Sequence, residues 1–357
     1  MSDISKIDKN FKIETKIQKD DIKFISALEN CFDIYGLMCT DGVFHRIPYD
    51  VAKNTSTAVT ILNENTAGGR IRFKTNSKYV IVHSQTDPVQ TNSHISVLGK
   101  TGFDLYLIEN GTPVYFKSFI PPFETEETFE QIVEFPDNCE RDILIHFPLY
   151  NTCKNLYIGV QQTSYVKNGS EYKHKKPMVF YGSSITQGGC ASRPGNNYLN
   201  HISRYFDADF INLGFSGACK AEQAMQEYIP TIDMSIFVYD YEYNAPTPEY
   251  FAETHEQLFK KFREKQPFTP VIFKSNAERN YTLQELEAMY KRRKTIITTY
   301  NNAIADGDKN VYFLDGLDIF RIAGGCDCTV DGTHPNDLGF WCIGQAMIKV
   351  IKDNKLL

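Results

Sequence analysis

The sequence predicts an α/β protein in two parts, a β-sandwich followed by a three-layer α/β/α domain with a parallel sheet. The chain has 357 residues, more than one hydrophobic core usually serves, so we expect two domains. In the first half, short alternating segments are separated by turn residues, whereas from Pro177 onward apolar runs alternate with helical patterns. We place a jelly-roll-like sandwich over residues 1–172 and the α/β/α domain over residues 173–357.

The first part is predicted to consist of many short β-strands. Apolar and polar residues alternate in residues 69–74 and 79–82, and turn residues such as Asn110-Gly111 follow such segments. The further strand candidates are residues 103–107, 114–119, 143–147 and 156–160. Short strands at this spacing are typical of sandwiches and jelly rolls. Residues 22–29 are the stretch of this part with a helical pattern.

The second part is predicted to alternate strands with helices. The strand candidates are residues 178–181, 210–213, 236–239, 271–273 and 311–314, and helical patterns cover residues 197–206, 220–228, 248–263, 283–302 and 337–351. This alternation indicates βαβ units and a parallel sheet covered by helices. Ligands bind such sheets at the carboxyl ends of the strands, so the residues that follow each strand are the first candidates for a site.

Composition and charge narrow the class of protein. A formal net charge of −6 without a dense cluster of lysine and arginine argues against a nucleic-acid partner. No apolar run is long enough to span a bilayer, and residues 1–6 lack the apolar core of a signal peptide, so we expect a cytoplasmic protein without a membrane partner. The nine cysteines are scattered, and the close pair Cys326 and Cys328 lacks a partner pair at metal-site spacing. We expect reduced thiols and no structural zinc.

Residues 181–189, YGSSITQGG, directly follow the first predicted strand of the second part. They could form a phosphate-binding loop, a plain strand-to-helix turn with a capping serine, or a turn that presents a nucleophilic serine. The stretch has neither a Gly-Lys-Ser/Thr ending nor the glycine spacing of a dinucleotide-binding loop, which argues against the first interpretation.

Four segments at strand ends or before the last helix carry groups that together can perform acyl transfer. They are Gly182-Ser183-Ser184-Ile185-Thr186, Asn212-Leu213-Gly214-Phe215-Ser216-Gly217, Asp240-Tyr241-Glu242-Tyr243-Asn244 and Asp331-Gly332-Thr333-His334. A serine attacks an acyl carbon when a histidine accepts its proton and an aspartate orients the histidine. Backbone N–H groups and an asparagine side chain can stabilise the developing oxyanion.

In type and order, these segments resemble the four sequence blocks of the SGNH (GDSL) hydrolase superfamily. In the first part, Thr101-Gly102-Phe103-Asp104-Leu105-Tyr106 resembles the Gly-x-Asp-Leu-Tyr signature of a β-domain that precedes one branch of these esterases. The resemblance implies an SGNH-hydrolase catalytic domain over residues 173–357. Members of this branch, and the two-domain carbohydrate esterases to which the chain is similar, remove acyl groups, commonly acetyl, from sugars.

Carried over residue by residue, the resemblance implies a role for each candidate site residue. Ser184 would be the nucleophile, and its N–H would be one donor of the oxyanion hole. Gly217 would supply a second N–H, and Asn244 would supply a side-chain donor. His334 would act as the base, and Asp331 would fix its tautomer. In some related esterases a backbone carbonyl orients the histidine, so this alternative to the aspartate stays open.

The chain departs from the pattern of the family in two of the blocks. Ser183 stands where an aspartate usually precedes the nucleophile, which removes a side-chain contact but no catalytic group. Tyr243 and Ala245 flank Asn244 in place of the usual glycine and aspartate, which changes the immediate neighbours of Asn244. Gly217 also has a purely structural interpretation, since glycine permits a tight turn with positive φ.

The sequence therefore predicts a serine esterase that removes acyl groups, with acetyl favoured, from an O-acylated carbohydrate through an acyl-enzyme intermediate. This chemistry needs no metal ion and no organic cofactor. The expected partner is a small-molecule or oligosaccharide ester, and a homo-oligomer is compatible with the sequence. Two alternatives are an esterase for lipid-like or small aryl esters and a non-catalytic carbohydrate-binding protein.

Overall fold

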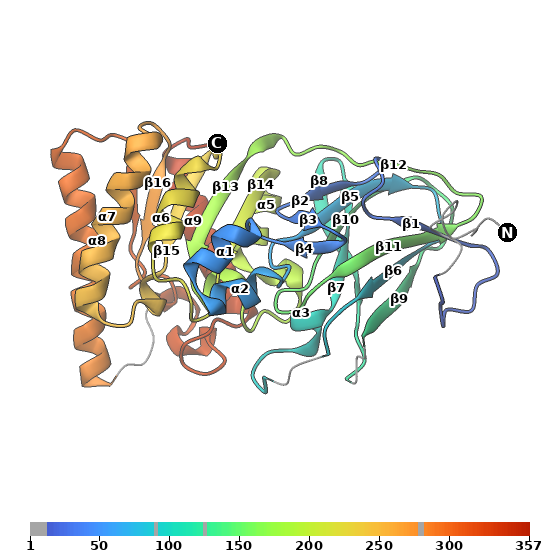
Figure 1. Cartoon of the computed structure of the whole chain (residues 1–357), viewed down its shortest axis with the longest axis horizontal. Coiled ribbons are helices and arrows are strands. Elements are labelled where there is room, and N and C mark those ends of the chain that lie inside the picture. The colour runs from blue at the N-terminus through green and yellow to red at the C-terminus, as the bar shows by residue number, and fades with distance from the viewer. Residues whose placement is uncertain (1–12, 89–91, 124–126, 278–281) are drawn as a thin grey trace.

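The computed structural model of the chain describes residues 13–88, 92–123, 127–277 and 282–357 (Figure 1). The antiparallel strands of the N-terminal half lie at one end of the long axis, and a helix-covered parallel sheet lies at the other. Residues 1–6, for which the sequence predicts no signal peptide, are outside the described residues. Within the described ranges, no helix combines the length and the apolar character that crossing a membrane requires.

The N-terminal half forms the predicted β-sandwich. One sheet has the order β3 (Met38–Thr40), β4 (Val43–His45), β11 (Lys154–Gln161), β6 (Tyr79–Gln85) and β9 (Thr128–Glu134), with β1 (Ile22–Ser26) also paired to β11. The other has the order β12 (Val166–Asn168), β5 (Arg70–Thr75), β10 (Arg141–His146), β7 (Phe103–Glu109) and β8 (Thr112–Phe119), with β2 (Asp33–Tyr35) paired to β5. Alternate residues such as Ile71, Phe73, Val80 and Val82 are buried in the core between the two sheets.

The C-terminal half forms the predicted parallel sheet between two helical layers. The strand order is β14 (Ala208–Gly214), β13 (His174–Gly182), β15 (Ile236–Asp240), β16 (Val271–Lys274) and β17 (Val311–Leu314). One face packs on α5 (Tyr198–Phe206) and α9 (Asp337–Asp353), and the other on α6 (Gln223–Tyr228), α7 (Pro248–Lys265) and α8 (Leu283–Ala305). The side chains of β13 alternate between the layers, since Val179 and Tyr181 join one apolar cluster and Met178 and Phe180 the other.

The prediction of a helical pattern at residues 22–29 is wrong. Residues Ile22–Ser26 form strand β1, which pairs antiparallel with β11 from Ile22 opposite Gln161 to Ser26 opposite Tyr157. The pattern was too short to distinguish the two periods, and the buried side chain of Phe24 belongs to the same apolar cluster as Ile81 of β6, the strand on the other side of β11.

Helices in the N-terminal half were not predicted. They are α1 (Tyr49–Thr55), α2 (Thr57–Asn63) and α3 (Val97–Thr101). Ala52 of α1 and Val59 of α2 share an apolar cluster with Val179 of β13, so these two helices cover the parallel sheet and not the sandwich (Figure 1). The N-terminal half thus contributes directly to the packing of the C-terminal domain.

Two buried arginines of β5 tie the sandwich to the α/β/α domain. Arg70 forms an ion pair with Asp209 and donates to the carbonyl of Phe210 at 2.9 Å. Arg72 forms an ion pair of 3.1 Å with Asp207. Asp207 is the C-cap of α5 and Asp209 is the second residue of β14, so charged pairs fix the sandwich next to the first edge strand of the parallel sheet.

Candidate active site

The candidate site residues gather at the topological switch point of the parallel sheet. The first strand, β13, lies between β14 and β15, so the next two strands along the chain lie on opposite sides of it. Gly182 at the end of β13 is paired with Gly214 of β14 and with Asp240 of β15. Crevices of open α/β sheets form at such a point. The segments that follow these three strands therefore begin side by side.

Ser184 is the first residue of the short helix α4 (Ser184–Gln187), directly after β13. The Ser183 side chain caps this helix by accepting from the Ile185 N–H at 3.2 Å. Ser183, which departs from the family pattern, therefore has a structural role. The backbone leaves no room for a side chain at Gly182, since a Cβ there would lie 2.1 Å from Thr186 Oγ1. The N–H of Ser184 is among the first in the helix, where N–H groups have no intrahelical acceptor.

A chain of short hydrogen bonds joins Ser184, His334 and Asp331. Ser184 Oγ lies 2.9 Å from His334 Nε2, and His334 Nδ1 lies 2.7 Å from Asp331 Oδ2. Among the described residues, the carboxylate of Asp331, and not a backbone carbonyl, thus lies at hydrogen-bond distance from His334 Nδ1. With the carboxylate accepting at Nδ1, the proton of a neutral imidazole stays there, and the lone pair of Nε2 faces the serine.

The turn that carries Asp331 and His334 is held by the aspartate itself. Asp331 Oδ1 accepts from the N–H groups of Thr333 at 2.9 Å and His334 at 2.7 Å, an arrangement that brings residues i and i+3 together. Gly332 between them has φ of +81°, which favours glycine. Burial by itself would raise the pKa of Asp331, but the hydrogen bonds from His334 and Thr333 outweigh it and lower the pKa to about 2. The carboxylate is therefore charged at neutral pH.

Asn244 and Gly217 follow the two strands next to β13. Asn244 Oδ1 accepts from the Cys219 N–H at 3.3 Å, which ties the two segments together and leaves the amide nitrogen to act as a donor. Gly217 is exposed, its φ is +69°, and open space surrounds the position of a Cβ, so the backbone conformation and not crowding selects glycine. Gln187 Oε1 accepts from the Ser216 N–H at 3.0 Å and fixes the residue before this glycine.

A buried ion pair lies beneath the nucleophile turn. Asp240 at the end of β15 and Lys274 at the end of β16 are both almost fully buried, and Lys274 Nζ lies 3.0 Å from Asp240 Oδ1. The second carboxylate oxygen accepts from Thr186 Oγ1 of α4 at 3.3 Å. Asp240, which belongs to the third sequence block, thus supports the helix that begins at Ser184.

The sandwich half supplies residues to the site that the sequence did not indicate. Tyr150 donates its hydroxyl to the carbonyl oxygen of Ser184 at 3.1 Å, and the amide of Gln187 donates to the Leu149 carbonyl at 3.0 Å. Tyr150 and Ser216 also line a pocket whose other walls come mostly from the N-terminal half. Its polar residues include Glu64, Asn65, Asp87, Asn92, Asn151 and Thr152.

The aspartate of the Gly-x-Asp-Leu-Tyr segment reaches across to the loop after the nucleophile. Asp104 is fully buried, and its carboxylate accepts from His146 Nδ1, from Arg193 Nη1, both at 2.7 Å, and from the Gly195 N–H at 2.8 Å. Arg193 also stacks on Tyr115, with its guanidinium 4.0 Å from the ring centroid. This signature therefore positions a loop of the other domain.

His94 and Cys190 lie next to His334, and sequence reasoning missed both. The rings of His94 and His334 have centroids 5.6 Å apart. Burial raises the pKa of the Cys190 thiol to about 12, so at neutral pH it is protonated and does not compete with Ser184 as a nucleophile. A histidine in a loop of the sandwich half gave no local signal of this proximity.

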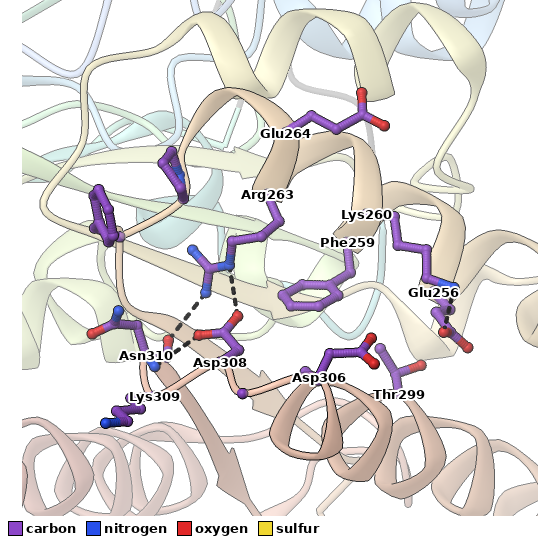
Figure 2. Close-up of a pocket in the computed structure, with 14 residues that line it drawn as sticks. Glu256, Phe259, Lys260, Arg263, Glu264, Thr299, Asp306, Asp308, Lys309 and Asn310 are labelled. Atoms are coloured by element: carbon purple, nitrogen blue, oxygen red, sulfur yellow. Dashed lines mark hydrogen bonds and ion pairs between the residues drawn. The ribbon is translucent and has the colours of Figure 1, made fainter.

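A second cavity lies between α7 and the end of α8, away from these residues (Figure 2). Arg263 crosses it to form an ion pair of 2.7 Å with Asp308, and Phe259 forms an apolar wall. The four sequence blocks contribute nothing to its lining, so we do not assign the chemistry to it.

Two family models match the chain in successive stretches. Residues 175–352 match the GDSL-like lipase/acylhydrolase family, and residues 22–166 match the GxDLY domain, the N-terminus of SGNH-hydrolase-type esterases. The comparison with curated proteins finds no match.

Solved structures share the fold over almost the whole chain. A Bacteroides ovatus protein assigned as a GDSL-like lipase is 29% identical, with a TM-score of 0.85 over 93% of this chain and 98% of its own. The salicylyl-acyltransferase SsfX3 of a tetracycline biosynthetic pathway is 16% identical, with a TM-score of 0.79 over 95% and 99%. An acetyl xylan esterase of the rumen bacterium Butyrivibrio proteoclasticus is 12% identical, with a TM-score of 0.58 over 94% and 99%.

The fold and the family matches define a carboxylic ester hydrolase of the SGNH type. The chain belongs to the GDSL-like lipase/acylhydrolase family, in the branch in which a GxDLY β-domain precedes the catalytic domain.

Proposed function

We propose that the protein is a serine esterase in which Ser184 is the nucleophile, His334 the general base and Asp331 the group that orients the base. The single observation that carries this proposal is the hydrogen-bond chain of 2.9 Å from Ser184 Oγ to His334 Nε2 and 2.7 Å from His334 Nδ1 to Asp331. These are the distances at which a base can take the hydroxyl proton as the serine attacks.

The reaction proceeds in two halves. Ser184 Oγ attacks the acyl carbon while His334 takes the proton, and the resulting imidazolium returns it to the leaving alcohol as the acyl-enzyme forms. Water then attacks the acyl-enzyme with His334 again as the base. The charged Asp331 stabilises the imidazolium in both halves.

The oxyanion of each tetrahedral intermediate is assigned to the N–H groups of Ser184 and Gly217 and to the side chain of Asn244. The amide nitrogen of Asn244 is left to donate because its oxygen accepts from Cys219. The contact between Gln187 and Ser216 limits the movement of the loop that presents the Gly217 N–H. Donors fixed in this way stabilise charge without reorganising during the reaction.

We assign an acylated carbohydrate, with acetyl as the favoured acyl group, as the substrate. The pocket next to Ser216 and Tyr150 supports this assignment, because its carboxylate, amide and hydroxyl groups match the hydroxyl groups of a sugar better than an alkyl chain. The acetyl xylan esterase among the structural neighbours acts on such an ester, and it shares the two-domain architecture.

Replacement of the nucleophile tests the enzyme assignment. We expect Ser184→Ala to lower kcat for 4-nitrophenyl acetate by on the order of 10³-fold or more, since removal of one triad member leaves only the oxyanion hole and binding. The matched control is Ser183→Ala, which removes a helix cap but no reacting group. Unchanged hydrolysis in Ser184→Ala, with the melting temperature of that variant retained, would contradict the assignment.

A substrate panel tests the assignment of the carbohydrate. Release of acid is compared for acetylated xylo- and manno-oligosaccharides, for 4-nitrophenyl acetate and for esters of longer acyl chains. We expect the highest kcat/KM on an acetylated oligosaccharide. A preference for long acyl chains would favour the lipid-like alternative instead.

A further inference from the structure

His94, Cys190 and His334 bring three metal-binding side chains together at the mouth of the site. One ligand atom from each side chain lies within 4.8 Å of the other two. Two imidazoles and a thiolate are ligands that Zn²⁺ prefers. We propose that this cluster binds Zn²⁺ and that bound zinc switches the esterase off.

His94 is held at this place by the segment that follows it. Ser96 caps α3, and its hydroxyl donates to the Ser192 carbonyl at 2.8 Å. Gly99 of the same helix packs so closely on the loop that a Cβ there would lie 2.2 Å from the Ala191 carbonyl oxygen. The short helix of the sandwich half is thus docked on the residues directly after Cys190, with His94 two positions before the cap.

The loop of Cys190 is in turn fixed to the helix that follows His334. Asp337, the first residue of α9, accepts from the Ser192 N–H at 2.9 Å and from Asn196 Nδ2 at 2.7 Å. Cys190 itself is buried and has φ of +72°, a conformation that is uncommon for a residue other than glycine. All three ligands therefore sit on segments that are bonded to one another.

The geometry needs only a small contraction to accept the ion. Zinc–nitrogen and zinc–sulfur bonds of about 2.0–2.3 Å place tetrahedral ligands about 3.5 Å apart. His94 is exposed, so its ring can rotate toward the other two ligands. Three protein ligands leave the fourth position of the tetrahedron open to water.

The charges at the site also suit the ion. On binding, the Cys190 thiol loses its proton to solvent, and the thiolate neutralises one of the two charges of the ion. The carboxylate of Asp331, hydrogen-bonded to His334, lies close enough to offset the other. The ion therefore adds little uncompensated charge.

Binding of zinc and general-base catalysis exclude each other at His334. Asp331 keeps the imidazole proton on Nδ1, so the lone pair that zinc requires is on Nε2, the atom that lies 2.9 Å from Ser184 Oγ. A metal bound there removes the group that would accept the serine proton. The inhibition rests on the proposed function, whereas binding of the metal does not.

In the first experiment, metal ions are removed from the protein, and inhibition of 4-nitrophenyl acetate hydrolysis by micromolar ZnCl₂ is measured in thiol-free buffer. We expect reversible inhibition that a chelator relieves. His94→Ala and Cys190→Ser should keep metal-free activity and raise the half-inhibiting zinc concentration by at least about tenfold, because even groups that only orient a ligand alter metal affinity by about 10–100-fold. The exposed Cys139→Ser is the matched control and should respond as the wild type does. Absence of inhibition, or equal inhibition of all variants, would overturn the proposal.

The second experiment separates binding from catalysis. Co²⁺ replaces zinc in the inactive Ser184→Ala variant, and a near-ultraviolet charge-transfer band from thiolate to cobalt is recorded. We expect the band in Ser184→Ala and its loss when Cys190→Ser is added, with Cys139→Ser again as the control. A band that persists without Cys190 places the metal elsewhere and overturns the site, even if the serine-esterase assignment stands.

Discussion

The two halves of this molecule divide the work of the site between them. The α/β/α domain carries Ser184, His334 and Asp331, and these side chains bond to one another at the ends of the sheet. The β-sandwich carries none of the three, yet its Tyr150 bonds to the carbonyl oxygen of Ser184 and its Asp104 bonds to the loop that follows the nucleophile helix. Comparison of the halves thus suggests that one supplies the reacting groups and the other holds them in place. Substitutions in the two halves should accordingly affect different properties of the protein.

Loss of the aspartate should have the largest effect on activity. We expect Asp331→Asn to lower kcat by on the order of 10³–10⁴-fold, since the histidine then loses its tautomer and its counter-charge. Because the pKa of Asp331 is lowered to about 2, the wild-type carboxylate stays charged across the working pH range. The deficit should therefore persist from pH 7 to 9 in a kcat–pH profile. A deficit that disappears at high pH would contradict this role, and the exposed Asp353→Asn serves as the control.

Removal of the side-chain oxyanion donor should come next. We expect Asn244→Ala to lower kcat by on the order of 10²–10³-fold with little change in KM, because the donor acts on charge that develops only in the transition state. Steady-state kinetics on 4-nitrophenyl acetate measure both constants. If KM alone rises, Asn244 binds substrate instead; the control is Asn302→Ala, on the exposed face of α8.

A change in the sandwich half should affect stability more than chemistry. We expect Asp104→Asn to lower the free energy of unfolding by about 3 kcal/mol, because it leaves the Arg193 guanidinium without its buried counter-ion. The loosened loop should lower kcat/KM by only about tenfold. Denaturant unfolding and kinetics are measured in parallel with Glu109→Gln, an exposed change on the same strand. A loss of activity as large as that of Asp331→Asn at unchanged stability would break the division between the halves.

The smallest effect should follow removal of a single hydroxyl. Tyr150→Phe deletes the hydrogen bond to the Ser184 carbonyl, which is worth about 0.5–1.5 kcal/mol, so kcat/KM should fall by about 2–10-fold. The exposed Tyr49→Phe should have no effect on the same assay. An unchanged kcat/KM in Tyr150→Phe would show that the sandwich half does not act on the nucleophile through this contact.

Much of the α/β/α domain could be predicted from the sequence because local patterns encode it. Each buried strand of the parallel sheet is a compact apolar run, and the helices between them show a clear period, so all ten predicted elements of this half are present. That the four sequence blocks lie close together could be predicted because parallel strands end at the same edge of a sheet. The contact between Asp331 and His334 is also local, since a single turn brings these two residues together.

The remaining parts depend on contacts between segments far apart in the chain. Helices α1 and α2 are short, and their apolar faces are completed by a cluster of the α/β/α domain, more than a hundred residues later, so their local pattern was weak. The positions of Tyr150, His94 and Cys190 around the triad likewise follow from the docking of the two halves. Periodicity carries no information about such docking.

Covalent trapping of the nucleophile tests the central claim most directly. The folded protein is treated with phenylmethylsulfonyl fluoride, and the modified peptide is identified by mass spectrometry alongside His334→Ala under the same conditions. The account predicts one adduct per chain, on Ser184, that forms far more slowly without His334. An adduct on another residue, or equal labelling rates in the two proteins, would contradict it.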